Sequence, residues 1–472
     1  MIGRLKERKV LEEALASPRS EFVAVFGRRR IGKTFLINET FGGRYAFQHS
    51  GAENVGTREQ LDFFRLSISR YFGTKCPRLD NWRTAFFELE ERLAKAGEGK
   101  KIVFLDEIPW LDTPKSGFLS AFEHFWNGWA SLRHDILLVI CGSATSWVVK
   151  EILRNRGGLH NRVTRPLPIA PFTLAECEEF AKSSALPFDR RQIAECYMAF
   201  GGVAYYWSLL SPSLSAAQNF DNLFFSKQAL LKDEFPRLFA SLFKHSQKYV
   251  EIVTILASCA QGLVRDEILA GMAPPCGGEI SRYLQELEEC GFVRRNPVLG
   301  KSRKGAVYQL IDNFTLFHFK FLKERKGTDE HFWEVSYASP TVNVWRGLSF
   351  ERLCFWHIPQ IKRALGISGI LADVYSWRGK TGDPDAEEAQ IDMLIDCGDR
   401  VINVCEMKYS SGEYSMSEEE GRKLQRRMEV FRTATRTAKG LMPTLVCNVG
   451  LKRNANSAFI QAVVTLDDLF RE

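Results

Sequence analysis

The chain has 472 residues, of which 45% are hydrophobic and 26% are charged, and its formal net charge is +7. A chain of this length is too long for one hydrophobic core, so we expect roughly two to four domains. The composition is typical of an ordinary soluble globular protein. Its positive charge is mild for the length, so the location of the basic residues matters more than their total.

The sequence also argues against membrane and zinc-binding classes. No apolar run approaches the roughly 20 residues of a membrane span, and the first residues are charged and amphipathic, unlike a signal peptide. The 11 cysteines include no C-x-x-C pair, and the eight histidines show no zinc-binding spacing. We therefore expect a cytoplasmic protein with no membrane contact.

The strongest motif lies near the start of the chain. Residues 22–26 form an apolar run that predicts a buried strand, and a helix-like segment follows the next motif. Between them lies GRRRIGKT, which fits the spacing G-x-x-x-x-G-K-[ST]. In such a loop backbone N–H groups face phosphate oxygens, the lysine contacts the β- and γ-phosphates, and the hydroxyl binds Mg²⁺. The sequence predicts an ATP-binding P-loop formed by Gly27, Arg28, Arg29, Arg30, Ile31, Gly32, Lys33 and Thr34.

Two further strand ends are expected at the same site. An apolar strand over 101–106 ends in Asp106 and Glu107. Beside a P-loop the first acid could hold the Mg²⁺ through water, and Glu107 could polarise the attacking water. Another buried strand, 136–142, is followed by Ser143, which could sense the γ-phosphate or simply be a turn serine.

Three arginines have open roles. Arg162 and Arg165 precede a further expected strand, and either could act as an arginine finger in cis or toward a neighbouring subunit of a homo-oligomer. Both could equally be exposed charges. Arg4 could reach the nucleotide, or it could be a solvated surface residue.

Alternating strands and helices over this region predict a parallel sheet with helices on both faces. FGRRRIGKT, FLDEIPWL and the strand ending in CGS resemble the archaeal-type AAA+/STAND-clade P-loop ATPases. The resemblance implies a P-loop ATPase core over 1–170 and a helical lid over 171–235. The lid signature G-G-x-P-x-Y is approximated by residues 201–206, with Ala204 in place of proline.

The pattern over 236–329 predicts a winged helix. Three helical segments are followed by two strands around a turn, and the hairpin is basic without an acid. A basic wing suits DNA phosphates; its residues are Arg294, Arg295, Lys301, Arg303 and Lys304. The preceding helix carries Glu286, Glu288 and Glu289, which disfavours reading of bases, so a packing or coupling module is the alternative.

The last third contains a second possible site. Folding 389–396 and 401–408 as an antiparallel hairpin about Asp399 places Asp392 opposite Glu406, and Gln390 opposite Lys408. Facing carboxylates favour a cation between them, such as Mg²⁺ or Mn²⁺. Lys408 could then orient or deprotonate the water that attacks a phosphodiester. A solvated hairpin with surface charges is the alternative.

This pattern resembles the PD-(D/E)xK restriction-endonuclease-like fold, here over 330–472. The resemblance implies that Asp392 and Glu406 bind the metal, that Lys408 is the catalytic lysine, and that Glu351 on the preceding helix is an additional acid. Gln390 stands where relatives commonly have glutamate, which would reduce metal affinity.

A basic amphipathic helix is expected after Gly421. Its basic face could bind a DNA backbone through Arg422, Lys423, Arg426 and Arg427. The alternative is a surface helix whose charge is balanced by Glu418, Glu419 and Glu420.

The sequence thus predicts an α/β protein: a P-loop parallel-sheet ATPase core with a helical lid, a winged helix, and a C-terminal α/β restriction-endonuclease-like domain. ATP and Mg²⁺ are the expected cofactors. Nucleotide-driven movement would pass through the winged helix to a metal-dependent nuclease-like domain acting on DNA. The alternative is an ATP-dependent regulatory switch that binds nucleic acid or a protein without cleaving.

Overall fold

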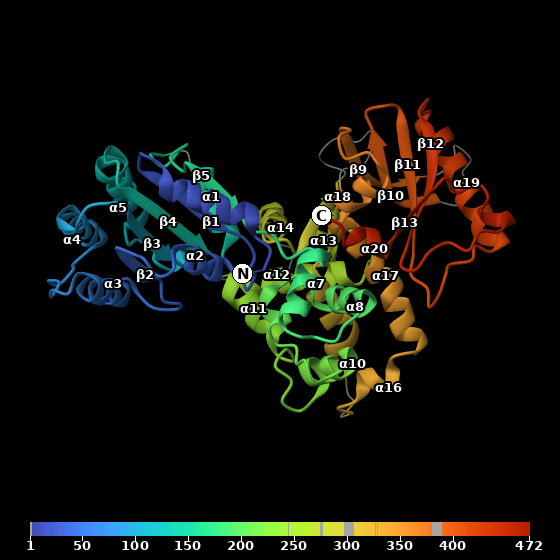
Figure 1. Cartoon of the computed structure of the whole chain (residues 1–472), viewed down its shortest axis with the longest axis horizontal. Helices are drawn as coiled ribbons and strands as arrows, with labels where there is room; N and C mark the ends of the chain where they lie inside the picture. Colours follow the sequence, from blue (N-terminus) through green and yellow to red (C-terminus); the bar gives the residue numbers. More distant parts are fainter. Residues whose placement is uncertain are drawn as a thin grey trace. The chain divides into compact units, whose positions relative to one another are not determined.

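The computed structural model describes residues 2–155, 157–243, 245–273, 277–296, 306–325, 327, 329–379 and 389–472. The chain divides into two compact units, Met1–Pro171 and Phe172–Glu472 (Figure 1). The expectation that residues 1–170 form an ATPase core stays a prediction. Over the described residues, no helix is both long and apolar enough to cross a membrane.

The first unit is built on a parallel sheet of five strands in the order β2-β3-β4-β1-β5. Its strands are β1 (Glu21–Phe26), β2 (Phe47–Ser50), β3 (Lys101–Asp106), β4 (Ile136–Gly142) and β5 (Arg165–Pro168). Successive β1 side chains point to opposite faces, because strand side chains alternate. Val23 and Val25 pack toward α1 (Leu5–Ala16) and α2 (Lys33–Phe41).

Phe22 and Ala24 point to the other face of this sheet, which is covered by α3 (Thr57–Phe72), α4 (Trp82–Lys95) and α5 (Phe118–His124). Both faces are therefore covered, so every residue of β3 and β4 is buried, and the middle of each strand is apolar. The predicted α/β class with a parallel sheet is confirmed.

The second unit begins with helices: α7 (Leu174–Ser183), α8 (Arg190–Phe200), α9 (Ala204–Trp207), α10 (Ala216–Phe220) and α11 (Glu234–Leu242). They are followed by α12 (Ser246–Ala257), α13 (Arg265–Gly271) and α14 (Ile280–Glu289). A small antiparallel sheet completes this part, with β6 (Leu263–Val264), β7 (Val293–Asn296) and β8 (Val307–Leu310) in the order β6-β8-β7. These are the helices and hairpin strands expected there, while the turn at 297–305 lies outside the described residues.

The C-terminal part contains α15 (Asn313–Phe317), α16 (Phe332–Ser336), α17 (Pro340–Trp356) and α18 (Ile358–Ala364) before a mixed sheet in the order β13-β12-β11-β10-β9. The strands are β9 (Ala372–Gly379), β10 (Ala389–Cys397), β11 (Val401–Lys408), β12 (Gly440–Cys447) and β13 (Ala462–Thr465). β9, β10 and β11 are antiparallel, whereas β11, β12 and β13 are parallel. α19 (Glu418–Thr435) connects β11 to β12, and α20 (Leu466–Leu469) follows β13.

One hydrophobic core runs through the second unit. It extends from Phe172 in the first helices, through Phe292 beside the small sheet, to Met393 and Cys405 on one face of the mixed sheet. The opposite face packs on α19 through Phe431 and its neighbours. The boundaries expected at 235 and 329 stay predictions, since this core continues across both of them.

Candidate functional site

The P-loop connects β1 to α2 at the carboxyl edge of the parallel sheet. Gly27 has a φ of 146° and Gly32 a φ of 88°. A Cβ atom at Gly27 would lie 2.3 Å from the carbonyl oxygen of Ile169, so a larger residue cannot fit. Ile31 is buried and anchors the loop on the core, while Arg29 forms a long ion pair (4.0 Å) with Glu53.

Lys33 is turned back into this loop and is only 5% exposed. Its Nζ donates to the carbonyl oxygens of Gly27 (2.9 Å) and Arg28 (2.8 Å) and to Oγ of Ser143 (3.2 Å). These partners are all uncharged, and a buried ammonium is more stable with an anion beside it. The loop is therefore suited to a phosphate group.

Two hard oxygen ligands adjoin the lysine. The Thr34 hydroxyl donates to Oδ2 of Asp106 at 3.0 Å, and Oδ1 of Asp106 accepts the backbone N–H of Glu107 at 2.9 Å. Burial raises the pKa of Asp106, and the charge of Glu107 raises it further. A divalent cation would relieve this repulsion, so the donor set fits Mg²⁺.

Glu107 lies just past the end of β3 and has left-handed backbone angles (φ 43°, ψ 46°). This uncommon conformation turns its carboxylate toward the end of β4, where Oε1 accepts the Ser143 hydroxyl at 2.6 Å and Oε2 accepts the Ser143 N–H at 3.1 Å. Ser143 thus connects Lys33 to Glu107. The structure brings together the predicted residues of the P-loop, Asp106, Glu107 and Ser143.

The predicted arginine fingers lie at the other edge of the sheet. β5 runs parallel to β1 with Arg165 opposite Val23, so Arg165 is the first residue of the strand and Arg162 precedes it, both at the amino edge of the sheet. Arg165 pairs with Glu13 at 3.1 Å and with Glu21 at 3.7 Å, while Arg162 is exposed. This placement disfavours the in cis role, and a role of Arg162 toward a neighbouring subunit stays a prediction.

Arg4 is buried, which excludes the solvated alternative. Its Nη2 donates to the carbonyl oxygen of Ala170 at 2.6 Å, next to Ile169, which lies against Gly27. Arg4 therefore sits at the same edge of the sheet as the P-loop.

The C-terminal hairpin has the expected register. Met393 lies opposite Cys405 and Leu394 opposite Val404, the pairing predicted about Asp399. Asp392 and Glu406 each adjoin the last of these pairs, Met393 with Cys405. The strict alternation assumed for residues 390–396 is wrong, however, because the pairing of β10 with β9 shifts between Ile391 and Leu394. Both of these residues pack in the same core, so Asp392 lies on a β-bulge. Bulges often re-aim a side chain beside an active site.

Three acids lie within electrostatic range of one another here. Burial and the charge of Glu406 raise the pKa of Asp392. Burial, and next the charge of Asp392, raise the pKa of Glu351 on α17 to about 7. Gln390 donates to Oδ1 of Asp392 at 2.8 Å, so the amide stabilises this carboxylate. The carboxylate chemistry fits a divalent cation.

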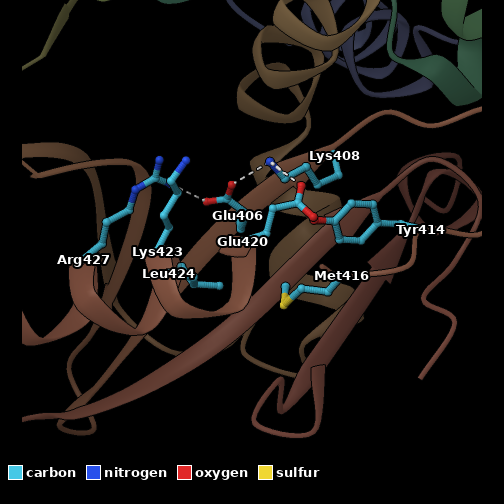
Figure 2. A pocket seen from close by; sticks show the side chains of 8 residues that line it. All are labelled: Glu406, Lys408, Tyr414, Met416, Glu420, Lys423, Leu424 and Arg427. Atoms are coloured by element: carbon cyan, nitrogen blue, oxygen red, sulfur yellow. Dashed lines mark hydrogen bonds and ion pairs between the residues drawn. The ribbon is translucent and has the colours of Figure 1, made fainter. Parts of the chain in front are cut away.

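The acids do not converge on one point, however. Over the described residues, oxygens of Glu351, Asp392 and Glu406 are not all within 4.8 Å of one another. Glu406 instead contacts Lys408 Nζ (3.0 Å) and Arg427 Nη1 (3.1 Å) at the rim of a pocket of about 270 Å³ (Figure 2). A metal bound by Glu406 would have to compete with these two cations.

The basic residues of α19 differ in their contacts, and these contacts bear on the two alternatives of DNA binding and a charge-balanced surface. Arg422 pairs with Glu418 (3.7 Å) and Lys423 with Glu419, both within exposed helical turns. These pairs match the balanced-surface alternative. Arg427 instead reaches Glu406, a contact that the sequence did not suggest because it depends on how α19 packs on the mixed sheet.

The predicted basic wing is only partly described. Lys301, Arg303 and Lys304 fall outside the described residues. Arg294 packs inside the unit, with its guanidinium 3.7 Å from the ring centre of Phe355 on α17 and Nη2 donating to Gln309 at 2.8 Å. Burial lowers its pKa to about 10, with a contribution from Arg352. Contact of Arg294 or Arg295 with DNA stays a prediction.

Another group of ligand-type residues was missed from the sequence. Asp221, His331 and Glu334 have side-chain atoms within 4.8 Å of one another. Asp221 already accepts the backbone N–H groups of Trp333 (2.7 Å) and Glu334 (3.1 Å), and so caps the start of α16. This capping role explains the cluster without a metal.

No protein-family model matches the chain. The protein named "Uncharacterized protein MJECL04" from Methanocaldococcus jannaschii is 25% identical over 365 residues, covering 75% of this chain and 76% of that protein. The Walker-type ATPase of Pyrococcus abyssi is similar in structure (TM-score 0.49, 15% identity), over 68% of this chain and 96% of the other. The ORC2 protein of Aeropyrum pernix is also similar in structure (TM-score 0.41, 17% identity), over 67% of this chain and 92% of the other. With TM-scores below 0.5, neither likeness carries the functional argument, which rests on the site itself.

Proposed function

We propose that the first unit binds and hydrolyses ATP. The observation that carries this proposal is the convergence of Lys33, the Thr34–Asp106 pair and Glu107 at one edge of the sheet. The backbone N–H groups of 27–33 and the Lys33 ammonium would hold the β- and γ-phosphates. Thr34 and Asp106 would hold Mg²⁺, which neutralises the phosphate charge when bound.

Glu107 would then polarise the attacking water. Its carboxylate is fixed by the hydroxyl and N–H groups of Ser143, and this serine also accepts from Lys33. Loss of the γ-phosphate would therefore alter the contacts of both Lys33 and Glu107, because the Ser143 side chain bonds to both. This connection supports the predicted role of Ser143 as a γ-phosphate sensor.

We propose further that the ATPase controls a metal-dependent nuclease-like site in the second unit, with DNA as substrate. Asp392 on its bulge and Glu406 on the neighbouring strand β11 would hold the metal, and Glu351 would supply a further acid. When bound, the metal supplies Lewis-acid activation of the phosphodiester. Lys408 would orient the attacking water, and Arg427 would contact a backbone phosphate once released from Glu406.

The alternative, a switch that binds nucleic acid or a protein without cleaving, is favoured by one observation. Glu406 is already neutralised by Lys408 and Arg427, and Gln390 replaces a possible third ligand. In that case the pocket would bind an anion through its basic rim and would need no metal.

A plasmid assay distinguishes the nuclease from the non-cleaving switch. The full-length protein is incubated with supercoiled plasmid and Mn²⁺, with and without ATP. Cleavage that Lys408→Ala abolishes while ATP hydrolysis continues would support the nuclease. Absence of nicking by the wild type under both conditions would leave the non-cleaving switch. Arg471→Ala is the control, because it removes an exposed cation of the second unit that pairs with Asp468 and does not line the pocket.

A further inference from the structure

A buried carboxylate in the second unit connects its first helices to the C-terminal site. Glu195 on α8 is 2% exposed. It accepts hydrogen bonds from the hydroxyl groups of Tyr337 (3.2 and 3.1 Å) and Tyr409 (3.0 Å). Arg346 Nε lies 3.2 Å from its Oε1, and Arg191 Nε lies 3.8 Å away. One acid thus holds four side chains.

These partners come from the elements that carry the proposed nuclease site. Tyr409 directly follows Lys408 at the end of β11. Arg346 lies on α17, the helix that bears Glu351, and Tyr337 lies just before that helix. Glu195 therefore touches both the strand and the helix on which the site is built.

A second residue of α8 strengthens the hold on the strand end. Arg191 Nε donates to the Tyr409 hydroxyl at 3.2 Å, and its Nη1 donates to the carbonyl oxygen of Ser411 at 3.1 Å. The guanidinium also lies 5.4 Å from the ring centre of Tyr409. α8 thus contacts the segment after Lys408 through both side-chain and backbone atoms.

Glu195 and Arg346 are the buried centre of this cluster. A carboxylate taken out of water is stable only while its hydrogen bonds and ion pairs are complete, so its partners cannot move away one at a time. Burial and the charge of Glu195 both raise the pKa of Tyr409, and the hydroxyl therefore stays protonated and continues to donate. A displacement of α8 would carry the end of β11 with it.

We propose that Glu195 is a positioning residue for Lys408, through which movement of α8 adjusts the C-terminal site directly. This inference rests on the proposed function, because it assumes that nucleotide binding moves the helices at 174–200. In this proposal nucleotide-driven movement reaches the C-terminal site through the Glu195 cluster, whereas the sequence predicted that it passes through the winged helix.

Two tyrosines give a matched pair for the test. Tyr409→Phe and Tyr337→Phe each remove one hydroxyl that donates to Glu195, but only the first lies beside Lys408. Full-length wild type and both variants are compared by hydrogen exchange over 404–412, with and without a non-hydrolysable ATP analogue. Mn²⁺-dependent plasmid nicking is measured in parallel.

We expect the analogue to change exchange over 404–412 in wild type and Tyr337→Phe, and to have a smaller effect in Tyr409→Phe, which keeps only the contacts of Arg191 with the aromatic ring and with the Ser411 carbonyl oxygen. Nicking should fall by about tenfold or more in Tyr409→Phe, because small misplacements of a catalytic group are costly. The inference would be overturned if the analogue changed exchange over 404–412 equally in both variants. It would also be overturned if the analogue caused no change in wild type. A normal nucleotide response without nicking would overturn the nuclease proposal and leave Glu195 as the connection between α8 and β11.

Discussion

At the scale of single residues, the Lys33 ammonium decides whether the loop holds phosphate. Lys33→Ala should weaken ATP binding by about 10- to 100-fold, since hydrogen bonds to charged groups contribute about 1.5–3 kcal/mol each. Titration with a fluorescent ATP analogue measures this. Arg8→Ala is the control, because it removes a positive charge that pairs with Glu12 on the exposed face of α1. Unchanged affinity in the Lys33 variant, with melting temperatures equal to wild type, would end the P-loop argument.

Glu107 should act in the chemical step and contribute little to binding. In Glu107→Gln the amide keeps the shape of the side chain and can still accept the Ser143 N–H, so ATP affinity should stay within a few-fold of wild type. Turnover should fall by about 10²–10⁴, the usual contribution of a positioned acid or base. Single-turnover hydrolysis measures the step. Full turnover in this variant would assign water activation to another residue.

The sequence predicted these residues because strand ends in a parallel sheet meet at one edge. It could not predict the hydrogen bonds of Ser143 to both Lys33 and Glu107, because they depend on the left-handed backbone at Glu107. Arg294 shows the opposite outcome. Its place in a basic hairpin suggested exposure, but Phe355, far away in the sequence, covers its guanidinium.

At the scale of elements, α7 and α17 are joined by one histidine. His357 is fully buried; its Nε2 accepts the N–H of Leu174 at the start of α7 (3.0 Å), and its Nδ1 bonds to the Leu353 carbonyl oxygen (2.8 Å). An unsatisfied N–H at a helix start is thereby given an acceptor from another helix. Burial lowers the pKa of His357 to about 4.

This depressed pKa predicts acid sensitivity of the second unit. The neutral ring is favoured on folding, so its contribution is complete above about pH 6.5, the ordinary pKa, and is lost as pH falls toward 4. The shift corresponds to about 3 kcal/mol. Denaturant unfolding between pH 7 and 4 should show a smaller loss of stability in His357→Gln than in wild type. Equal pH dependence would mean that the ring is not held neutral. His245→Gln is the control, because it replaces an exposed imidazole in the same unit.

The hairpin of β10 and β11 shows which features of strand pairing can be predicted from the sequence pattern. Pairing about Asp399 followed from a short turn and two runs of strand residues, and the register is confirmed. The bulge at Asp392 was not predictable, because it arises from pairing with β9, whose register no local residue indicates. Similarly, the contact of Arg427 with Glu406 requires the packing of α19 on the sheet.

At the scale of the whole molecule, one core runs from Phe172 to Phe470, so an isolated C-terminal fragment is not a suitable protein for experiments. Cutting the chain near residue 330 would expose apolar faces that are buried on both sides of the cut. The same continuity lets contacts such as those of Glu195 and His357 join early helices to late strands. Measurements on the C-terminal site therefore require the full-length chain.

Metal binding in that full-length chain is the last prediction. If Asp392 and Glu406 hold a divalent cation, Mn²⁺ should raise the melting temperature of the second unit, because the free energy of unfolding grows with the logarithm of one plus the ratio of free Mn²⁺ to its dissociation constant. Asp392→Asn removes one ligand charge and should reduce this shift, whereas Asp399→Asn, in the exposed turn between the strands, should keep it. Arg427→Ala should enlarge the shift, because Glu406 would lose a competing cation. Calorimetry with and without Mn²⁺ tests all three, and equal melting temperatures throughout would show that the acids of this hairpin bind no metal.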